Sequence, residues 1–282
     1  MAETARKIKV VIGEKNFNIG GIQRVALDLV RHLDKSKFEV FLITLQQWHD
    51  RGTFYDTVPV EVPIFRLNLN HWSSIREWYT LVRTLNHIKP DVVRSSSFFC
   101  NAVFRILQPL FGYRVIASEH NTMLQRGRLH TLANMLLSPM TYITVGVSQM
   151  VVDELAESGG FVRSKLKVIH NGIDLDAITR AKQRYRKSTL RTNLGLQPQD
   201  KVFLSVARFF KQKNHSLMIH AFKRLTELRD DCKLLLIGHG VLFEESRSLA
   251  RSLGVEDRVI FLGEQREVYP FYVASDFFIM TS

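Results

Sequence analysis

One stretch decides the fold: Val202-Phe-Leu-Ser-Val-Ala-Arg208-Phe-Phe-Lys-Gln-Lys213-Asn-His-Ser-Leu-Met-Ile-His-Ala-Phe222. Its first residues, 202–207, form an apolar run with the length and β-branched content of a strand that is buried on both faces. A basic loop follows, and apolar residues then recur at helical spacing up to Phe222. A strand, a short loop and a helix in this order predict a parallel α/β sheet, with the loop at the carboxyl end of its strand.

The loop carries three cations, and we expect two of them, Arg208 and Lys213, to form an anion site. Open α/β sheets bind their ligands at the carboxyl ends of the strands. Two cations beside the free amides of a helix N-terminus suit a diphosphate. A solvated basic loop is the alternative interpretation, and this stretch alone leaves both open.

Length and composition place the chain among globular proteins with two domains. It has 282 residues, of which 45% are hydrophobic and 23% are charged. The first residues lack the pattern of a signal peptide, and no apolar run approaches the roughly 20 residues that span a bilayer. Cys100 and Cys232 lie far apart in apolar surroundings, which predicts buried thiols and a reducing cytoplasm.

The net charge of +12, from 39 Lys and Arg against 27 Asp and Glu, favours anionic partners such as nucleotides, nucleic acids or an anionic membrane surface. The densest basic cluster, at 180–191, contains one aromatic residue, Tyr185. Nucleic-acid sites more often combine such charge with several aromatics, so we expect no nucleic-acid partner. A solvated helix in a linker is the preferred interpretation of the cluster, and attraction to a membrane surface comes second.

Strand and helix patterns alternate along the chain, with about seven strands in the first half and four in the second. The expected strands are 7–12, 38–45, 60–67, 91–93, 114–118, 143–147, 166–170, 202–206, 233–237, 259–262 and 276–280. The expected helices are 22–33, 72–85, 151–156, 216–228, 244–253 and 267–274. The fold class is therefore α/β, with two doubly wound, Rossmann-like sheets facing a cleft. We expect domains at 1–178 and 179–282.

An apolar stripe marks the second helix, and we interpret it as core rather than as a membrane anchor. It consists of Trp72, Ile75, Tyr79, Val82 and Leu85.

Several residues at strand ends are candidates for ligand binding. Gly20 and Gly21 precede a helix, where free amides favour negative charge, with a plain tight turn as the alternative. His120, in Glu119-His120-Asn121, follows a strand and is the candidate for chemistry in the first half, with a hydrogen-bonded structural role as the alternative. Gly238 and Gly240 follow another strand. A turn at Asn171-Gly172 leads to Asp174-Leu-Asp176, which we assign to helix capping, so no metal is expected.

In their order along the chain these motifs resemble the retaining GT-B glycosyltransferases of the family-4 type (glycosyl transferase group 1). The motifs are the paired glycines, Ser-Glu-His120-Asn, Gly146-Val-Ser148, His-Asn171-Gly172-Ile-Asp, Ala-Arg208 with Lys213-Asn, Gly238-His-Gly240 and Arg258-Val-Ile-Phe-Leu-Gly263. The resemblance implies a hexosyl-type glycosyltransferase that uses a nucleotide sugar, retains the anomeric configuration and needs no metal or other cofactor. It also implies a glycan, lipid-linked or polysaccharide-precursor acceptor and a cytoplasmic protein, with peripheral attachment at the inner face of the membrane as a further expectation.

The resemblance also implies roles for single residues. His120 would contact the transferred sugar, Arg208 and Lys213 would hold the donor diphosphate, and the donor-binding residues would further include Gly20, Gly21, Asn171, Gly238 and Gly240. The first domain would face the acceptor, and the second would bind the nucleotide sugar.

The family pattern continues beyond the strand at 276–280 with two glutamates that bind the sugar and the ribose, and the chain stops before them. We therefore expect a donor domain that is C-terminally truncated and incomplete. A catalytically incomplete or split subunit, completed by a partner chain, is the alternative. A basic nucleic-acid-binding protein would explain the charge but none of the motifs.

Overall fold

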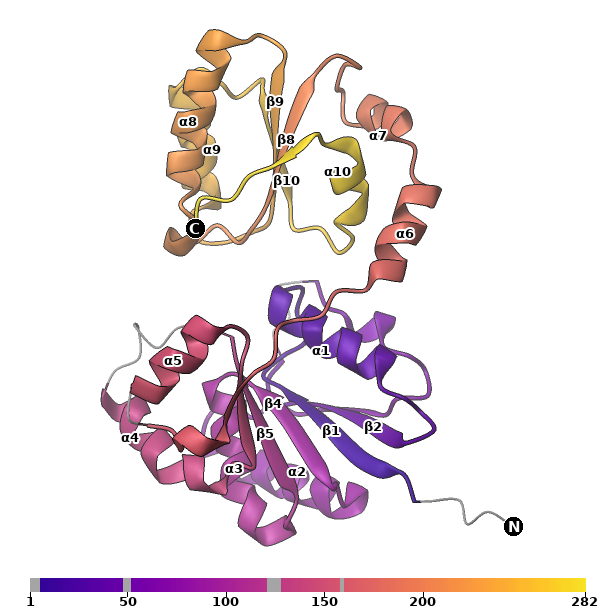
Figure 1. Cartoon of the computed structure of the whole chain (residues 1–282), viewed down its shortest axis with the longest axis vertical. Coiled ribbons are helices and arrows are strands. Elements are labelled where there is room, and N and C mark those ends of the chain that lie inside the picture. Colours follow the sequence, from indigo (N-terminus) through magenta and orange to yellow (C-terminus); the bar gives the residue numbers. More distant parts are fainter. Residues whose placement is uncertain (1–5, 48–51, 121–127, 158–159) are drawn as a thin grey trace. The chain divides into compact units, whose positions relative to one another are not determined.

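The computed structural model describes residues 6–47, 52–120, 128–157 and 160–282. The chain divides into two compact units, Met1–Ile173 and Asp174–Ser282 (Figure 1). The division falls after residue 173, whereas the sequence patterns placed it after 178.

Within the described residues, the first unit contains a sheet of seven parallel strands in the order β3-β2-β1-β4-β5-β6-β7. The strands are β1 (Ile8–Glu14), β2 (Phe38–Thr44), β3 (Ile64–Arg66), β4 (Val92–Ser96), β5 (Arg114–Glu119), β6 (Ile143–Gly146) and β7 (Leu166–Val168). The helices are α1 (Gly21–His32), α2 (Ile75–Ile88), α3 (Phe98–Phe111), α4 (Arg128–Leu137) and α5 (Gln149–Glu157), with short 3₁₀ turns at Tyr55–Thr57, Ser138–Met140 and Arg163–Lys165.

The second unit contains, among the same described residues, a parallel sheet of four strands in the order β10-β9-β8-β11. The strands are β8 (Lys201–Val206), β9 (Cys232–Ile237), β10 (Val259–Gly263) and β11 (Phe277–Phe278). The helices are α6 (Leu175–Arg184), α7 (Lys187–Asn193), α8 (His215–Leu228), α9 (Phe243–Ser252) and α10 (Tyr269–Ala274), with the 3₁₀ turn η5 (Lys211–Lys213). The predicted α/β class and both strand counts are confirmed.

Apolar side chains alternate between the two faces of each sheet, as the period of a strand requires. In β1, Val10 and Ile12 pack with Leu27 of α1, whereas Val11 packs on the opposite face with Leu81 of α2 and Phe104 of α3. The second sheet buries one cluster under α8 and α9 and another on its other face. Both sheets are therefore covered on both faces. The carboxyl ends of their strands are the positions at which we expect ligands to bind.

Each sheet has one point at which the strand order reverses. In the first sheet this switch point lies between β1 and β4, and in the second it lies between β8 and β11. Adjacent connections diverge there to opposite faces, and open α/β sheets bind their ligands beyond the carboxyl ends of the two strands at such a point.

Three expected elements differ from the structure. The strand expected at 60–67 is reduced to β3, because Pro63 lacks an amide hydrogen and Val60 is fully exposed before it. The connection at Asn171-Gly172 is irregular rather than a turn. Trp72, Ile75 and Tyr79 are exposed, so assigning them to the core was wrong.

The basic cluster at 180–191 is also more than a solvated linker helix. Arg191 is buried, and its guanidinium donates to Asp276 Oδ2 at 2.6 Å and to the carbonyl of Ala274 at 3.0 Å. Lys187 binds the other oxygen of Asp276 at 2.6 Å. Burial opposes ionisation of Asp276, but the bonds from Lys187, the amide of Val202 and Arg191 outweigh it and lower the pKa of this carboxyl. These ion pairs tie α7 to the core of the second unit.

The two cysteines and the lengths of the helices are the next features of the structure. Cys100 and Cys232 are buried free thiols, as expected, and burial raises the pKa of both. Over the described ranges, no helix has the length and apolar character needed to cross a membrane.

Candidate functional site

A buried ion pair occupies the switch point of the first sheet. Glu14 ends β1 and Arg94 lies in the adjacent β4, with exposed fractions of 1% and 8%. Arg94 Nη1 donates to Glu14 Oε1 at 2.6 Å, and the hydroxyl of Ser96 donates to Glu14 Oε2. Burial raises the pKa of Glu14, and the charge of Arg94 and the bond from Ser96 partly offset this rise.

His120 lies directly after β5, next to this ion pair. Its Nε2 is 3.4 Å from Arg94 Nη2 and 3.1 Å from Ser118 Oγ. A guanidinium can only donate, so Nε2 is the acceptor and the neutral ring carries its proton on Nδ1. Burial and the charge of Arg94 lower the pKa of His120 to about 4. At neutral pH the ring is therefore an uncharged hydrogen-bond donor and a weak base.

A second polar network lies beside this ion pair and joins β4, α3 and β5. Asn101 of α3 accepts from Ser95 Oγ at 2.7 Å and donates to Glu119 Oε1 at 2.8 Å, and all three are buried. Buried polar groups that satisfy one another fix the geometry of a site. The network anchors the residues that flank Ser96 and His120.

Gly20 and Gly21 form the start of α1, as predicted. Gly20 has extended backbone angles that any residue can adopt, and a Cβ there would contact the flexible end of Gln23. A Cβ on Gly21 would meet no described atom within 4 Å. The space beside the first amides of α1 is therefore open to a ligand, although the glycines are not required by backbone conformation.

Asn171 is exposed and lies on the connection between β7 and α6. Its contact with a donor stays a prediction. Asp174 accepts the amide of Ala177 at 2.8 Å and caps α6, which confirms the capping interpretation. Asn121, next to His120, lies outside the described residues.

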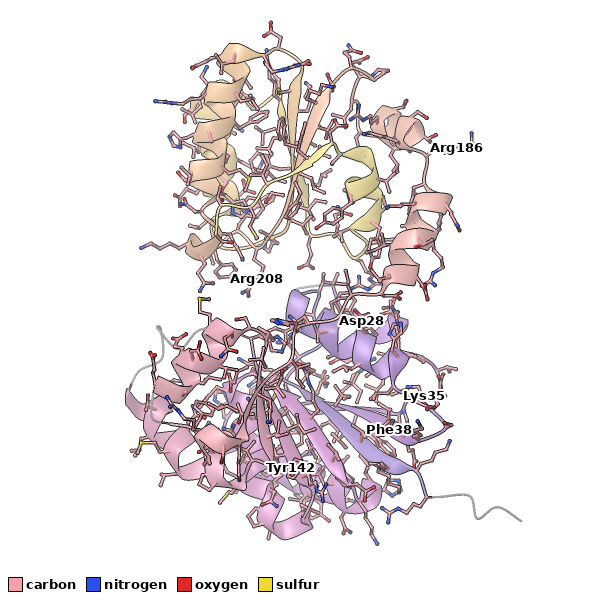
Figure 2. The ribbon with its side chains drawn as sticks, in the orientation of Figure 1. Asp28, Lys35, Phe38, Tyr142, Arg186 and Arg208 are labelled. Atoms are coloured by element: carbon pink, nitrogen blue, oxygen red, sulfur yellow. The ribbon has the colours of Figure 1, made fainter. Side chains whose placement is uncertain are left out.

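The loop after β8 carries Arg208 and Lys213 at the switch point of the second sheet. Figure 2 labels Arg208. Arg208 is exposed, and its guanidinium lies 5.0 Å from the ring centre of Phe210. Lys213 closes η5 and donates to Ser282 Oγ at 3.2 Å. Asn214 then caps α8 by accepting the amide of Leu217 at 3.3 Å. Lys213 thus lies directly before the N-cap of a 14-residue helix, and Arg208 lies five residues earlier on the same loop.

Gly238 and Gly240 belong to the next loop, which packs on the loop of Arg208. A Cβ on Gly238 would lie 2.0 Å from the carbonyl oxygen of Ala207, and one on Gly240 would lie 2.5 Å from that of Phe209. Gly238 also has a φ of +139°, which side chains rarely adopt. Both glycines are therefore needed to bring two ligand-edge loops together. Their contact with a nucleotide stays a prediction.

His215, the first residue of α8, was not singled out by its sequence position. Its ring stacks on Phe209 with centres 3.9 Å apart, and it is 3% exposed. Among the described residues, its Nδ1 has no hydrogen-bond partner. Burial and the charge of Lys213 lower the pKa of His215 to about 4.

The structure thus assembles two polar edges, one in each unit. It joins His120 to Arg94, Glu14 and Ser96, which the sequence analysis missed, and it keeps Arg208 and Lys213 on one loop as predicted. A charged residue within the strand sequence Val-Val-Arg94-Ser-Ser was the available signal for the missed pair.

Comparison with known proteins agrees with this architecture. The family model described as Glycosyltransferase Family 4 matches residues 19–177, and the model described as Glycosyl transferases group 1 matches residues 186–282. The structure of HepE from Anabaena with UDP and glucose aligns with a TM-score of 0.77 and 18% identity, over 98% of this chain and 74% of HepE.

Two curated relatives have informative names. The N-acetylgalactosamine-N,N'-diacetylbacillosaminyl-diphospho-undecaprenol 4-alpha-N-acetylgalactosaminyltransferase of Campylobacter jejuni is 28% identical over 93% of this chain and 71% of its own length. The alpha-monoglucosyldiacylglycerol synthase of Streptococcus pneumoniae is 34% identical over 48% of this chain, which spans only 31% of that relative. Together, the family models, the strand orders and the structural likeness show that this chain belongs to the family-4 glycosyltransferases, with the GT-B fold.

Proposed function

We propose that the chain transfers a sugar from a nucleotide-sugar donor to a lipid-linked acceptor, with retention of the anomeric configuration. The observation that carries this proposal is the position of Arg208 and Lys213 on one loop at the switch point of the second sheet. HepE, which shares this fold, is described with UDP and with UDP-glucose. The names of the two curated relatives refer to undecaprenol and to diacylglycerol.

In this proposal the second unit stabilises the leaving group. Negative charge develops on the diphosphate as the bond to the sugar breaks, and the two cations together with the N-terminal amides of α8 would stabilise that charge. Arg208 offers a planar set of donors that matches phosphate oxygens, and its stacking on Phe210 limits its conformations. Lys213 supplies a second charge at the other end of the same loop.

The first unit would position the sugar. Arg94 and Ser118 hold His120 through Nε2, which leaves Nδ1–H to donate to a sugar hydroxyl. A pKa of about 4 makes the ring unsuited to proton transfer at neutral pH, so its contribution is orientation. The amides at the start of α1 offer a further contact for an anionic group of the donor or acceptor.

The test is an assay of sugar transfer from a panel of radiolabelled nucleotide sugars to a lipid-diphosphate acceptor in detergent. We expect one donor to give a labelled lipid product whose anomeric configuration, measured by nuclear magnetic resonance, is that of the donor. His120→Ala should lower kcat while leaving the Kd for the nucleoside diphosphate nearly unchanged. Hydrolysis without transfer from every donor, or an inverted product, would contradict the proposal.

A further inference from the structure

We propose that His215 is a positioning residue for the donor diphosphate. Its ring holds Phe209 in place, and Phe209 fixes the backbone from which Arg208 extends. The inference deepens the proposed function and rests on it, because Arg208 is assigned there to the diphosphate. His215 itself is buried, so it acts through Phe209 and does not touch the donor.

The rings of His215 and Phe209 form a stack in the core of the second unit. Their centres are 3.9 Å apart, and their planes differ by 12°. Phe243 and Phe261 also lie against the ring of Phe209, with centres at 4.9 and 6.1 Å. Aromatic pairs of this kind stabilise a protein beyond the area that they bury, so the ring of Phe209 has one well-defined position.

The backbone of Phe209 is fixed as well as its ring. Its amide donates to the carbonyl of His239 at 3.1 Å, and its carbonyl accepts the amide of Leu242 at 3.1 Å. The same backbone lies against Gly240, where a Cβ would come within 2.5 Å of the Phe209 carbonyl oxygen. Arg208 comes directly before Phe209 in the chain, so these contacts fix the point from which its side chain starts.

The two ends of the donor loop, which we define as the connection from Arg208 to Lys213, are held in different ways. At its far end, the hydroxyl of Thr281 donates to the carbonyl of Lys213 at 2.8 Å. At its near end, the side chain of Arg208 is exposed, and the next residue is Phe209. The position of Arg208 therefore depends on Phe209 and its stack, whereas Lys213 has a separate anchor.

Core packing alone is the alternative role for His215. It shares the buried side of α8 with Met218, Ile219 and Phe222, as helical spacing requires. A purely structural residue would change the stability of the second unit but would leave the affinity of the folded protein for the donor unchanged. Among the described residues, Nδ1 of His215 has no hydrogen-bond partner, so a phenyl ring at this position should preserve the stack.

Isothermal titration with UDP tests the inference on the full chain. His215→Leu keeps an apolar side chain and removes the flat ring. Each side chain that must be ordered on binding lowers affinity by about 2- to 12-fold, so we expect the Kd for UDP to rise by a factor in this range. His215→Phe should keep the Kd of the unaltered chain, because it keeps the stack.

Phe222→Leu is the matched control for a loss of core packing. Phe222 is buried on the same side of α8 and packs against Phe203 of β8, with ring centres 6.5 Å apart. Its replacement removes an aromatic ring from the same core cluster, seven residues from His215. We expect the Kd of this variant for UDP to equal that of the unaltered chain.

A double-mutant cycle identifies the residue through which His215 acts. In the Arg208→Ala background, His215→Leu should cause little further loss of affinity, because the cation that it positions is gone. In the Lys213→Ala background it should cause the full loss, since Lys213 is held separately by Thr281. Ligand-observed nuclear magnetic resonance measures the weakest of these affinities.

Hydrogen exchange reports on the donor loop without any ligand. The amides of Phe210 and Lys213 donate to carbonyls within this loop. They should exchange about 2- to 12-fold faster in His215→Leu than in the unaltered chain, and at the unaltered rate in His215→Phe and Phe222→Leu. If the unaltered chain bound no UDP, the proposed function would be contradicted, and these exchange rates would still decide whether His215 fixes the loop.

Four results would overturn the inference. The first is an unchanged Kd, or unchanged exchange of the donor loop, in His215→Leu. The second is an equal loss of affinity in Phe222→Leu, which would show an effect of core packing alone. The third is a loss in His215→Phe as large as that in His215→Leu. The fourth is full additivity of His215→Leu and Arg208→Ala, which would show that His215 does not act through Arg208.

Discussion

Arg94 donates to Glu14 across 2.6 Å, although 80 residues separate them in the sequence. The bond joins β1 to β4 at the switch point of the first sheet, and the same guanidinium lies 3.4 Å from His120. A buried ion pair thus connects the core of this unit to the residue that we expect to contact the sugar. Because both charged groups are buried, we expect the pair to position His120 rather than to contact a ligand itself.

Arg94→Met should strongly destabilise the first unit. The substitution leaves the buried carboxylate of Glu14 without its cation, which typically costs about 3–5 kcal/mol. Unfolding in urea, followed by tryptophan fluorescence, is a suitable measurement because Trp72 and Trp78 lie in this unit. Glu14→Gln combined with Arg94→Met should recover most of the lost stability, since no buried charge then remains.

An exposed pair provides the control for this experiment. Arg6 forms an ion pair with Asp91 at 2.8 Å, with side-chain exposures of 72% and 39%. Arg6→Met should cost less than about 1 kcal/mol, as is typical of surface pairs. Equal effects of Arg6→Met and Arg94→Met would contradict our account of the switch point.

His215→Phe should remove part of the acid sensitivity of the second unit. The pKa of His215 is lowered to about 4 from an ordinary 6.5, so the unfolded chain takes up the proton first as the pH falls. Stability from this residue is complete above about pH 6.5 and is lost progressively down to about pH 4. Phenylalanine keeps the stacking on Phe209 and has no proton to gain.

Calorimetric unfolding at about pH 7 and about pH 5 measures this effect. The difference in Tm between the His215→Phe variant and the unaltered chain should grow as the pH falls. His220→Phe, on the exposed side of the same helix, should follow the unaltered chain at both values. If the difference in Tm were the same at both pH values, the pKa of His215 would not be lowered in the folded protein, which would contradict this prediction.

The α/β class was predictable because apolar periodicity reports burial directly. The run at 202–206 became β8 almost to the residue, since a strand buried on both faces needs a continuous apolar sequence. Periodicity was misleading for the stripe from Trp72 to Leu85, because it shows that residues share a side of a helix but not that this side is buried. Helix α2 has apolar residues on two sides, and local sequence does not show which side faces the sheet.

The candidate site was predictable where it is local and not where it depends on topology. Arg208 and Lys213 are five positions apart on one loop, so a strand–loop–helix pattern was enough to group them. The pairing of Glu14 with Arg94 follows from the adjacency of β1 and β4, which only the assembled sheet reveals. Gly238 was expected near a nucleotide, but the sequence could not show that the carbonyl of Ala207 occupies the space of its missing side chain.

The most direct test of the account is isothermal titration of the chain with UDP. Charge-assisted hydrogen bonds contribute about 1.5–3 kcal/mol each, so Arg208→Ala and Lys213→Ala should each raise the Kd by about 10- to 150-fold. Lys211→Ala, which removes an exposed cation from the same loop, serves as the control and should have a much smaller effect. We predict that the double variant of Arg208 and Lys213 no longer binds UDP measurably; an unchanged Kd in that variant would contradict the assignment of the donor site.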